Sequence, residues 1–220
     1  MLQLRKWLIE HNYDALIIPG TDPHGSEYLP DHWNLRQYLS GFSGSSGSLV
    51  ISTEKAALIT DSRYEIQGAQ EINPEIFDLI IDQREPGIPA NIKWILDSFD
   101  KQPNIAIYEK QAFVSSHKVL DQLQNNSLIK VHVIDEHPLF QNWDDRPALN
   151  CSQWNAKGKE LDDKNFNQKL SDIRSFMKEK NVDAHLISNL EAIARTLNIQ
   201  AYDVPNNLLG ISYLLVEEEN

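Results

Sequence analysis

The residues of this sequence that could do chemistry gather in its first third. Two histidines and two aspartates occur within residues 22–33, in the stretch DPHGSEYLPDHW. A glycine-rich stretch, GFSGSSG, follows at residues 41–47, and TDSRY at residues 60–64 places an acidic and a basic side chain two positions apart. These three stretches are the candidates for a functional site.

The first stretch carries residue types that bind metal ions. Imidazole and carboxylate groups are common ligands of divalent cations, so a small metal hydrolase is one hypothesis. It would use Asp22, His24, Asp31 and His32. Their spacing matches neither the two-histidine pattern of a metal-binding helix nor a carboxylate-rich loop. We therefore expect no metal ion at these residues, and elemental analysis would test the hydrolase hypothesis.

The glycine-rich stretch does not have the spacing of a known catalytic motif. No Lys-Ser or Lys-Thr pair follows it, as a phosphate-binding P-loop requires. Its serines also lack the GxSxG spacing of a nucleophile elbow. A tight turn that leads into a strand is the better interpretation.

Asp61 and Arg63 lie two residues apart at the end of a predicted strand, so their side chains point to the same side. One interpretation is a local ion pair with a helix cap. The other is that the guanidinium of Arg63 projects towards a peptide carbonyl or carboxylate, which it can hold with two hydrogen bonds. The residues alone leave both interpretations open.

Alternating helices and strands must position these stretches. Leu4, Trp7, Leu8 and His11 recur at helical spacing before an apolar run that Pro19 closes. Strands are predicted at Ser48–Ser52, Ala56–Thr60, Ile76–Ile81, Ile105–Tyr108 and Ile129–Ile134, and helices at residues 64–72, Ile92–Phe99 and Ser115–Gln124. This pattern predicts an α/β fold in which helices flank a sheet.

The second part of the chain repeats the start of the first. Residues 173–187 align with residues 4–18, and six of the 15 aligned positions are identical. Roughly one identity would be expected by chance. The identical pairs are Arg5/Arg174, Glu10/Glu179, Asn12/Asn181, Asp14/Asp183, Ala15/Ala184 and Ile18/Ile187. The second copy reaches a strand at Ser212–Val216, where the first copy still has most of its sheet to come. We therefore expect the second copy to be incomplete.

Composition excludes some partners. The chain has 220 residues, and 20 basic against 32 acidic side chains give a net charge of -12, which repels nucleic acids and anionic membranes. The first 20 residues carry charges throughout and predict neither a signal peptide nor a membrane span. A single cysteine, Cys151, excludes an internal disulfide. These features favour a cytoplasmic protein.

Several motifs resemble those of Xaa-Pro aminopeptidases (aminopeptidase P). PGTDPHGSEYLPDHWNLRQYLSGFSGSSGSLVIS, ALITDSRYEIQ and NWDDRP resemble the first creatinase-type domain and its linker, and DAHLISNLEAIARTLNI, DVPNN and SYLLV resemble the start of a second such domain. The resemblance implies a creatinase N-terminal-like sheet with a ribonuclease H-like motif. It implies a complete domain at residues 1–140, a linker at residues 141–155 and an incomplete second domain at residues 156–220.

The resemblance also implies a function for the whole parent enzyme. Its third domain, of the pita-bread type, holds two metal ions, usually Mn²⁺, and releases an N-terminal residue that precedes proline. The ligands of those ions belong to that domain, so this chain alone is expected to be inactive. Arg63 matches the arginine of the family's DSRY motif, which contacts the peptide, and His24, Asp61 and Tyr64 are further candidates for substrate binding.

The expected partners follow from the same resemblance. They are peptides with proline in second position, together with a second copy of the chain or a catalytic domain. A stand-alone peptide-binding or regulatory module, or a remnant of a split or decayed gene, are the alternatives.

The second domain departs from the family pattern IAWLLNxRGxDxxxNPV. Arg195, Gln200, Ala201 and Asn207 stand where Trp, Arg, Gly and Pro are usual. A buried aromatic side chain normally occupies the position of Arg195, and a buried charge without a partner is costly. We therefore expect Arg195 to weaken the packing of the second domain unless its charge finds a partner or water.

Overall fold

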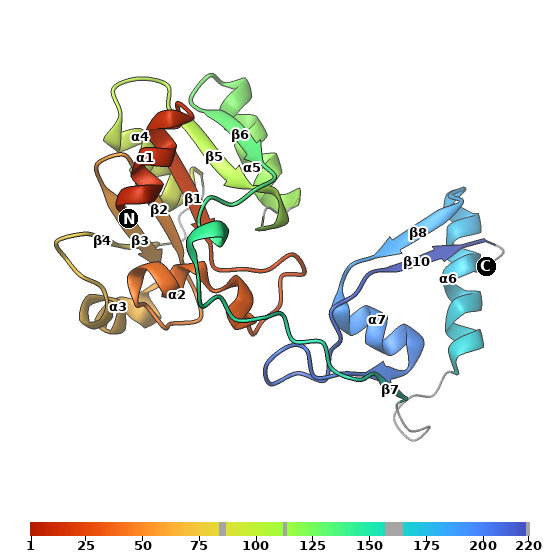
Figure 1. The fold of residues 1–220 in the computed structure, drawn as a ribbon. Helices are drawn as coiled ribbons and strands as arrows, with labels where there is room; N and C mark the ends of the chain where they lie inside the picture. Colours follow the sequence, from red (N-terminus) through yellow and green to blue (C-terminus); the bar gives the residue numbers. More distant parts are fainter. Residues whose placement is uncertain (84–86, 112–113, 157–164, 219–220) are drawn as a thin grey trace. The chain divides into compact units, whose positions relative to one another are not determined.

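The computed structural model describes residues 1–83, 87–111, 114–156 and 165–218, and only the backbone of residues 114–117. The chain forms two compact units (Figure 1). The first consists of Met1–Pro23 and His32–Pro147, and the second of His24–Asp31 and Ala148–Asn220. Within the described residues, every helix is too short or too polar to span a membrane.

A six-stranded mixed sheet forms the centre of the first unit, in the order β4-β3-β2-β1-β5-β6. Strand β1 pairs antiparallel with β2 and parallel with β5, and β2 runs antiparallel to both of its neighbours, β1 and β3. The strands are β1 (Ala15–Pro19), β2 (Ser48–Ser52), β3 (Ala56–Thr60), β4 (Asp78–Ile81), β5 (Asn104–Tyr108) and β6 (Lys130–Ile134). The predicted α/β fold is confirmed.

Helices cover both faces of this sheet (Figure 1). On one face, Leu4 and Leu8 pack against Leu16 and Ile18 of β1. On the other, Ile92 packs with the alternate residues of the strands, because successive side chains of a strand point to opposite faces. The first face carries α1 (Leu2–Glu10), α2 (Leu35–Ser40) and α3 (Glu65–Glu71), and the second carries α4 (Ala90–Ser98) and α5 (Val114–Asn125).

Most of the predicted elements lie where the sequence placed them. Strands β2 and β3 have the predicted bounds. Helix α2 was not predicted, because its six residues are too few for a periodic signal. Its ends are nevertheless well defined: Asn34 caps its first turn, and Gly41 ends it with a positive φ of 78°. The sequence analysis also missed the short 3₁₀ turns η1 (Asp31–Trp33), η2 (Ser62–Tyr64), η3 (Glu109–Gln111) and η4 (Phe140–Asn142).

The described residues of the second unit include two helices and short antiparallel strands. Strands β8 (Ala184–Ile187) and β10 (Leu214–Glu217) form one pair, and β7 (Asn155–Ala156) and β9 (Ile199–Gln200) form another. Helix α6 (Phe166–Lys180) precedes β8, and α7 (Leu190–Leu197) follows it. The hydrophobic core of the second unit includes the buried side chains of Leu190, Ile193, Ala194, Val204 and Leu209.

Arg195 meets solvent, which is the condition under which the sequence predicted no cost in stability. Helix α7 buries Ile193, Ala194 and Thr196, while Arg195 is exposed. Its carbonyl oxygen accepts a hydrogen bond from the ammonium group of Lys169. The charge therefore remains in solvent, and the family's aromatic residue is replaced without a desolvation penalty. Ala201, another departure from the family pattern, is fully buried.

The internal repeat is also a structural repeat. Helix α1 leads into β1 and α6 leads into β8, and both helices end on an asparagine in the left-handed region, Asn12 with φ 57° and Asn181 with φ 53°. The N–H of Tyr13 donates to Leu8 O at 2.9 Å, and the N–H of Val182 donates to Met177 O at 3.1 Å. Both ends are therefore Schellman motifs.

Asn12 should tolerate glycine but not a branched side chain. The left-handed conformation costs a residue with a Cβ roughly 1–2 kcal/mol, and asparagine and glycine adopt it most readily. We expect Asn12→Val to lower the free energy of unfolding by about 1–2 kcal/mol relative to Asn12→Gly. Urea unfolding followed by tryptophan fluorescence would measure this. Equal stability of the two variants would contradict the assignment.

Candidate functional site

Asp61 and Arg63 form a bidentate pair directly after β3. Arg63 Nε donates to Asp61 Oδ1 at 2.9 Å, and Arg63 Nη2 donates to Asp61 Oδ2 at 2.7 Å. The backbone N–H of Arg63 also donates to Asp61 Oδ1, at 3.1 Å, so Asp61 caps the turn η2. Cap and ion pair both restrict the rotation of the two side chains. The guanidinium is therefore held in one orientation.

The two partners differ in their exposure to solvent. The side chain of Asp61 is 8% exposed, whereas that of Arg63 is 64% exposed. Hydrogen bonds from Arg63 hold the pKa of the Asp61 carboxyl well below its usual range, and the same bonds raise the pKa of Arg63. A buried carboxylate thus supports an exposed guanidinium that stays charged at neutral pH.

Tyr64 continues the site. The guanidinium carbon of Arg63 lies 5.2 Å from the centre of the Tyr64 ring, within range of a cation–π contact. The Tyr64 hydroxyl and Ser45 Oγ are 2.6 Å apart, which is a hydrogen bond in either direction. The Tyr64 ring also meets Phe42 edge to face, with centroids 5.7 Å apart. Tyr64 therefore connects Arg63 to the glycine-rich loop, residues 41–47.

A buried arginine holds this glycine-rich loop in place. Arg36 is 3% exposed, and its Nη1 donates to Gly47 O at 3.1 Å while its Nη2 donates to Gly44 O. Burial lowers the pKa of the Arg36 guanidinium to about 10, so the group is still charged at neutral pH. Charged donors form stronger hydrogen bonds than neutral ones. The loop is thus an anchored turn into β2, as the sequence indicated.

A second polar group fixes the start of the loop. Ser43 donates through both its N–H and its hydroxyl to the carboxylate of Glu71, each at 2.8 Å. Gln67 donates to Glu71 Oε1 at 3.0 Å. The backbone bond from Ser43 lowers the pKa of Glu71. Helix α3 and the loop therefore form one hydrogen-bonded group around Tyr64.

The structure places the four predicted site residues in two groups. Asp61, Arg63 and Tyr64 lie together, as described above. His24 belongs to the second unit, where its Nδ1 lies 3.0 Å from Ser188 O and its ring contacts the Tyr213 ring at a tilt, with centroids 4.6 Å apart. Among the described residues, no three His, Cys, Asp or Glu side chains lie close enough to hold a metal ion. Of the four side chains of the hydrolase hypothesis, Asp22 and His32 belong to the first unit and His24 and Asp31 to the second.

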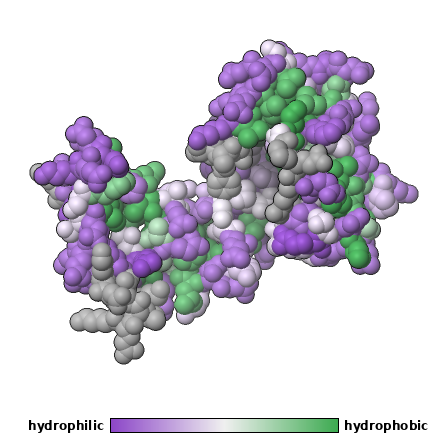
Figure 2. All heavy atoms as spheres, turned by 180° about the vertical axis from the view of Figure 1, so that it is seen from behind, coloured by the Kyte–Doolittle hydropathy of each residue, from purple (hydrophilic) through white to green (hydrophobic). Residues whose placement is uncertain are grey.

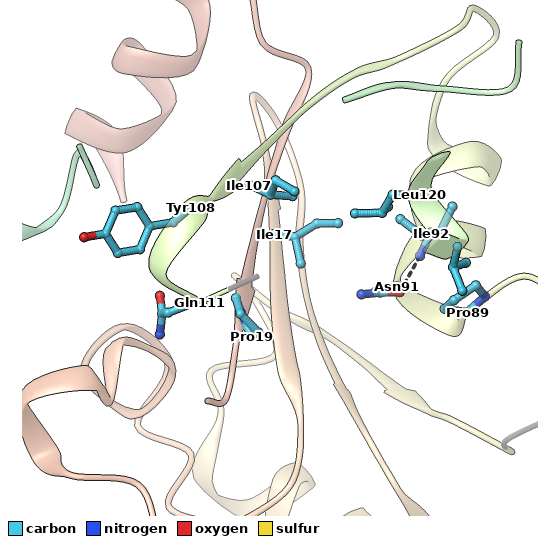
Figure 3. A pocket seen from close by; sticks show the side chains of 10 residues that line it. Ile17, Pro19, Pro89, Asn91, Ile92, Ile107, Tyr108, Gln111 and Leu120 are labelled. Atoms are coloured by element: carbon cyan, nitrogen blue, oxygen red, sulfur yellow. Dashed lines mark hydrogen bonds between the residues drawn. The ribbon is translucent and has the colours of Figure 1, made fainter. Parts of the chain in front are cut away.

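Two cavities lie near the ends of the strands. A polar one of about 240 Å³ borders Asp61 and is also lined by Ser46, Thr60, Asp82 and Asn91. An apolar one of about 300 Å³ lies between β1, β5 and the helices α4 and α5 (Figure 3). Figure 3 shows Ile17, Ile92 and Leu120 turned towards one another in it. Only the polar cavity adjoins the Asp61–Arg63 pair.

Family models match both parts of the chain. The description Creatinase/Prolidase N-terminal domain applies to the model that matches residues 1–137 and to the one that matches residues 145–220. The chain belongs to this family. Two matches to domains of the same kind agree with the internal repeat.

Xaa-Pro aminopeptidases are among the similar proteins. The chain is 29% identical over its full length to a probable Xaa-Pro aminopeptidase P from Talaromyces marneffei, covering 33% of that protein. It is 31% identical to aminopeptidase P2 from Arabidopsis thaliana, over 93% of this chain and 29% of the relative. The chain thus spans about a third of these relatives and corresponds to the N-terminal part of Xaa-Pro aminopeptidase family proteins.

A solved structure has the same fold. The X-prolyl aminopeptidase from Caenorhabditis elegans, described as a cytosolic enzyme with a di-nuclear active site, superimposes with a TM-score of 0.86 at 28% identity. The match covers 94% of this chain and 34% of that protein.

Sequence reasoning missed the groups that support Arg63. Arg36 and Glu71 belong to helices on either side of the glycine-rich loop, and neither has a recognisable spacing to Arg63. One available signal was the arginine that directly follows Leu35, since an arginine buried beside an apolar residue requires a set of carbonyl acceptors.

Replacement of Arg36 should destabilise the first unit. Arg36→Met leaves the carbonyls of Gly44 and Gly47 without a charged donor, and we expect a loss of about 3 kcal/mol from two charge-assisted hydrogen bonds. Urea unfolding would measure the loss. Lys93→Met is the matched control, because Lys93 lies on the surface with its ammonium 2.5 Å from Asp97. Equal effects of the two variants would refute the anchoring role of Arg36.

Asp61 should make stability depend on pH below about 4. Its pKa is lower in the folded state than in the unfolded chain, so its contribution is present at neutral pH and is lost as the pH falls below the unfolded value of about 4. Between pH 7 and pH 3, the wild type should therefore lose more stability than Asp61→Asn. Urea midpoints at the two pH values would test this. An equal loss in both proteins would contradict it.

Proposed function

We propose that this chain is the peptide-recognition part of an Xaa-Pro aminopeptidase. In this proposal the first unit shapes the peptide entrance beside a catalytic domain, and Arg63 holds a carbonyl or carboxylate group of the peptide. The observation that carries the proposal is the exposed guanidinium of Arg63, oriented by the buried carboxylate of Asp61.

The geometry of the pair leaves donors for a ligand. A guanidinium has five N–H groups, and Asp61 uses one from Nε and one from Nη2. The edge formed by Nη1 and the second hydrogen of Nη2 presents two parallel donors, which suit a carboxylate or a peptide carbonyl. Because Asp61 fixes the orientation, binding costs little side-chain entropy. Asp61 and Tyr64 act in this proposal by positioning Arg63.

The hydrolytic step would belong to a separate catalytic domain. The Caenorhabditis elegans relative is described as having a di-nuclear active site, and this supports a catalytic domain with two metal ions. We propose that these ions are Mn²⁺. The residues described in this chain do not fit such a centre, because no three potential ligands meet. We propose residues 1–140 and 156–220 as the two creatinase-type domains, with residues 141–155 as their linker.

The proposed partners are peptides with proline in second position, a second copy of the chain, and a catalytic domain. The names of the relatives support the peptide class. A cytoplasmic location is proposed from the cytosolic relative and the single cysteine.

Peptidase activity should appear only together with a catalytic domain. We expect no release of the first residue from a short Xaa-Pro peptide by the chain alone with Mn²⁺, because no metal ligands meet in the described residues. Mixing it with the catalytic domain of the Caenorhabditis elegans enzyme should restore cleavage, measured as free amino acid. Activity of the chain alone would refute the proposal, and silence of the mixture would favour a stand-alone binding module.

Within the active mixture, Arg63→Ala should lower kcat/KM about 10- to 100-fold, the effect of one charge-assisted contact. Arg63→Lys should recover little, since an ammonium lacks the two-pronged geometry. The backbone cap from Asp61 survives both changes. Lys93→Ala removes a charge of similar exposure and serves as the control. An unchanged kcat/KM in Arg63→Ala would exclude the residue from peptide binding.

A further inference from the structure

The apolar cavity of the first unit lies at the carboxyl ends of two adjacent parallel strands. Strands β1 and β5 run parallel, and their last residues, Pro19 and Tyr108, both line the cavity. The chain leaves β1 for β2 on one side and leaves β5 for β6 on the other side. In open α/β sheets ligands bind at such a place, because the two diverging connections leave a crevice between them. The position of the cavity is thus typical of a ligand site.

The cavity is larger than the voids that a packed core normally leaves. Protein interiors are as dense as organic crystals, and few of their voids exceed a water molecule. An apolar cavity of about 150 Å³ is enough to bind benzene. This cavity measures about 300 Å³, and its walls include the buried side chains of Ile17, Ile92 and Leu120. Its volume suits a ring with a short substituent.

The cavity is not sealed from solvent. Asn91 and Val119 line it and are only half-buried. Figure 2, which views the chain from the side opposite to Figure 1, shows hydrophobic residues gathered in patches at the surface among hydrophilic ones. A small apolar molecule therefore has access to the cavity from solution.

Asn91 gives the apolar cavity a polar end. Its Oδ1 accepts a hydrogen bond from the backbone N–H of Ile92 at 2.8 Å. The amide nitrogen lies on the other side of the group, and Figure 3 shows it turned away from Ile92. Gln111 also lines the cavity, but its amide nitrogen donates to Thr21 O at 2.7 Å. Because an amide nitrogen only donates hydrogen bonds, Asn91 would pair best with an acceptor oxygen of a ligand.

The surroundings of Asn91 argue against a charged ligand. Pro89 and Asn91 line both the apolar and the polar cavity, so the two cavities adjoin at the start of α4. Asp61 and Asp82 line the polar cavity and would repel an anionic head. A cationic head would face the N–H donors of Asn91 and lose its water against apolar walls. An uncharged acceptor fits both sets of neighbours.

We propose that the apolar cavity binds a small uncharged molecule with an apolar ring and one acceptor oxygen, such as a carbonyl. The ring lies between Ile17, Ile92 and Leu120, and the oxygen accepts a hydrogen bond from Asn91 Nδ2. This site does not use Arg63 and does not depend on the proposed peptidase role of the chain.

The full chain of 220 residues, with isotope-labelled isoleucine methyl groups, is the protein to test. The probe is acetophenone, followed by nuclear magnetic resonance. We expect saturable shifts of the Ile17, Ile92 and Ile107 methyl signals, with half-saturation at about 1 mM or below, as a ligand of this size allows. Ile72, which packs on the other face of the sheet, should not shift. Absence of the shifts, or an equal shift at Ile72, overturns the proposal.

Analogues with the same ring test the preference for an uncharged head. Benzoate carries a negative head, and 1-phenylethylamine carries a positive one. We expect each to bind about tenfold more weakly than acetophenone or less, because its charge must leave water. Equal or tighter binding of either charged analogue overturns the proposal.

A substitution of Asn91 tests the hydrogen bond. Asn91→Asp keeps an oxygen for the Ile92 N–H and removes the donor, so acetophenone should bind about fivefold more weakly or less. Isopropylbenzene has the same shape without the oxygen, and its affinity should stay unchanged. Equal responses of the two ligands to Asn91→Asp would exclude Asn91 from ligand binding and overturn the proposal.

A larger side chain tests the location. Val119→Phe should fill the cavity and weaken acetophenone binding about tenfold or more, because Val119 lines it. Val133→Phe makes the same change on β6, at a residue that is 53% exposed, and should leave the affinity unchanged. Circular dichroism verifies folding, and Asn91→Asp carries the test if Val119→Phe does not fold. Unchanged affinity in folded Val119→Phe, or an equal loss in both variants, overturns the proposal.

Discussion

The candidate site depends on the charge of one buried arginine. The Arg36 guanidinium binds the carbonyls of Gly44 and Gly47, and so it turns a flexible glycine-rich sequence into a fixed entry to β2. Gly20 packs closely against the Arg36 guanidinium. A Cβ on Gly20 would lie 2.5 Å from both Arg36 Nη1 and Gly47 O, so only glycine fits at the end of β1. Tyr64 packs against this loop, and Arg63 against Tyr64.

The Asp61–Arg63 pair unites two interpretations that the sequence treated as alternatives. The carboxylate caps a turn and pairs with the guanidinium, which is the structural interpretation. The same contacts leave Arg63 exposed, charged and oriented, which is what peptide recognition requires. A residue with a structural role in the free chain can thus be prepared for binding, because orientation in advance reduces the entropy cost of a contact.

The two units show how one sequence pattern leads to different surfaces. Asn12 and Asn181 end equivalent helices with the same backbone conformation, and an equivalent strand follows each. Ile17 is nevertheless buried while Leu186 is exposed, because α4 and α5 cover the sheet face in the first unit. Local hydrogen bonds determine the repeated turn between helix and strand at Asn12 and Asn181. Packing against distant helices determines whether the strand that follows is buried.

The sequence by itself determined the fold class, most element bounds, the internal repeat and the resemblance to the family, because apolar periodicity, turn residues and motifs act over short distances. It also named Asp61, Arg63 and Tyr64 as candidates, and the structure shows that these three side chains contact one another. Only the tertiary structure decided that Arg36 and Glu71 hold the loop beside them, and that Arg195 is exposed. Each of these depends on contacts between residues distant in the chain, and such contacts leave no local pattern to read.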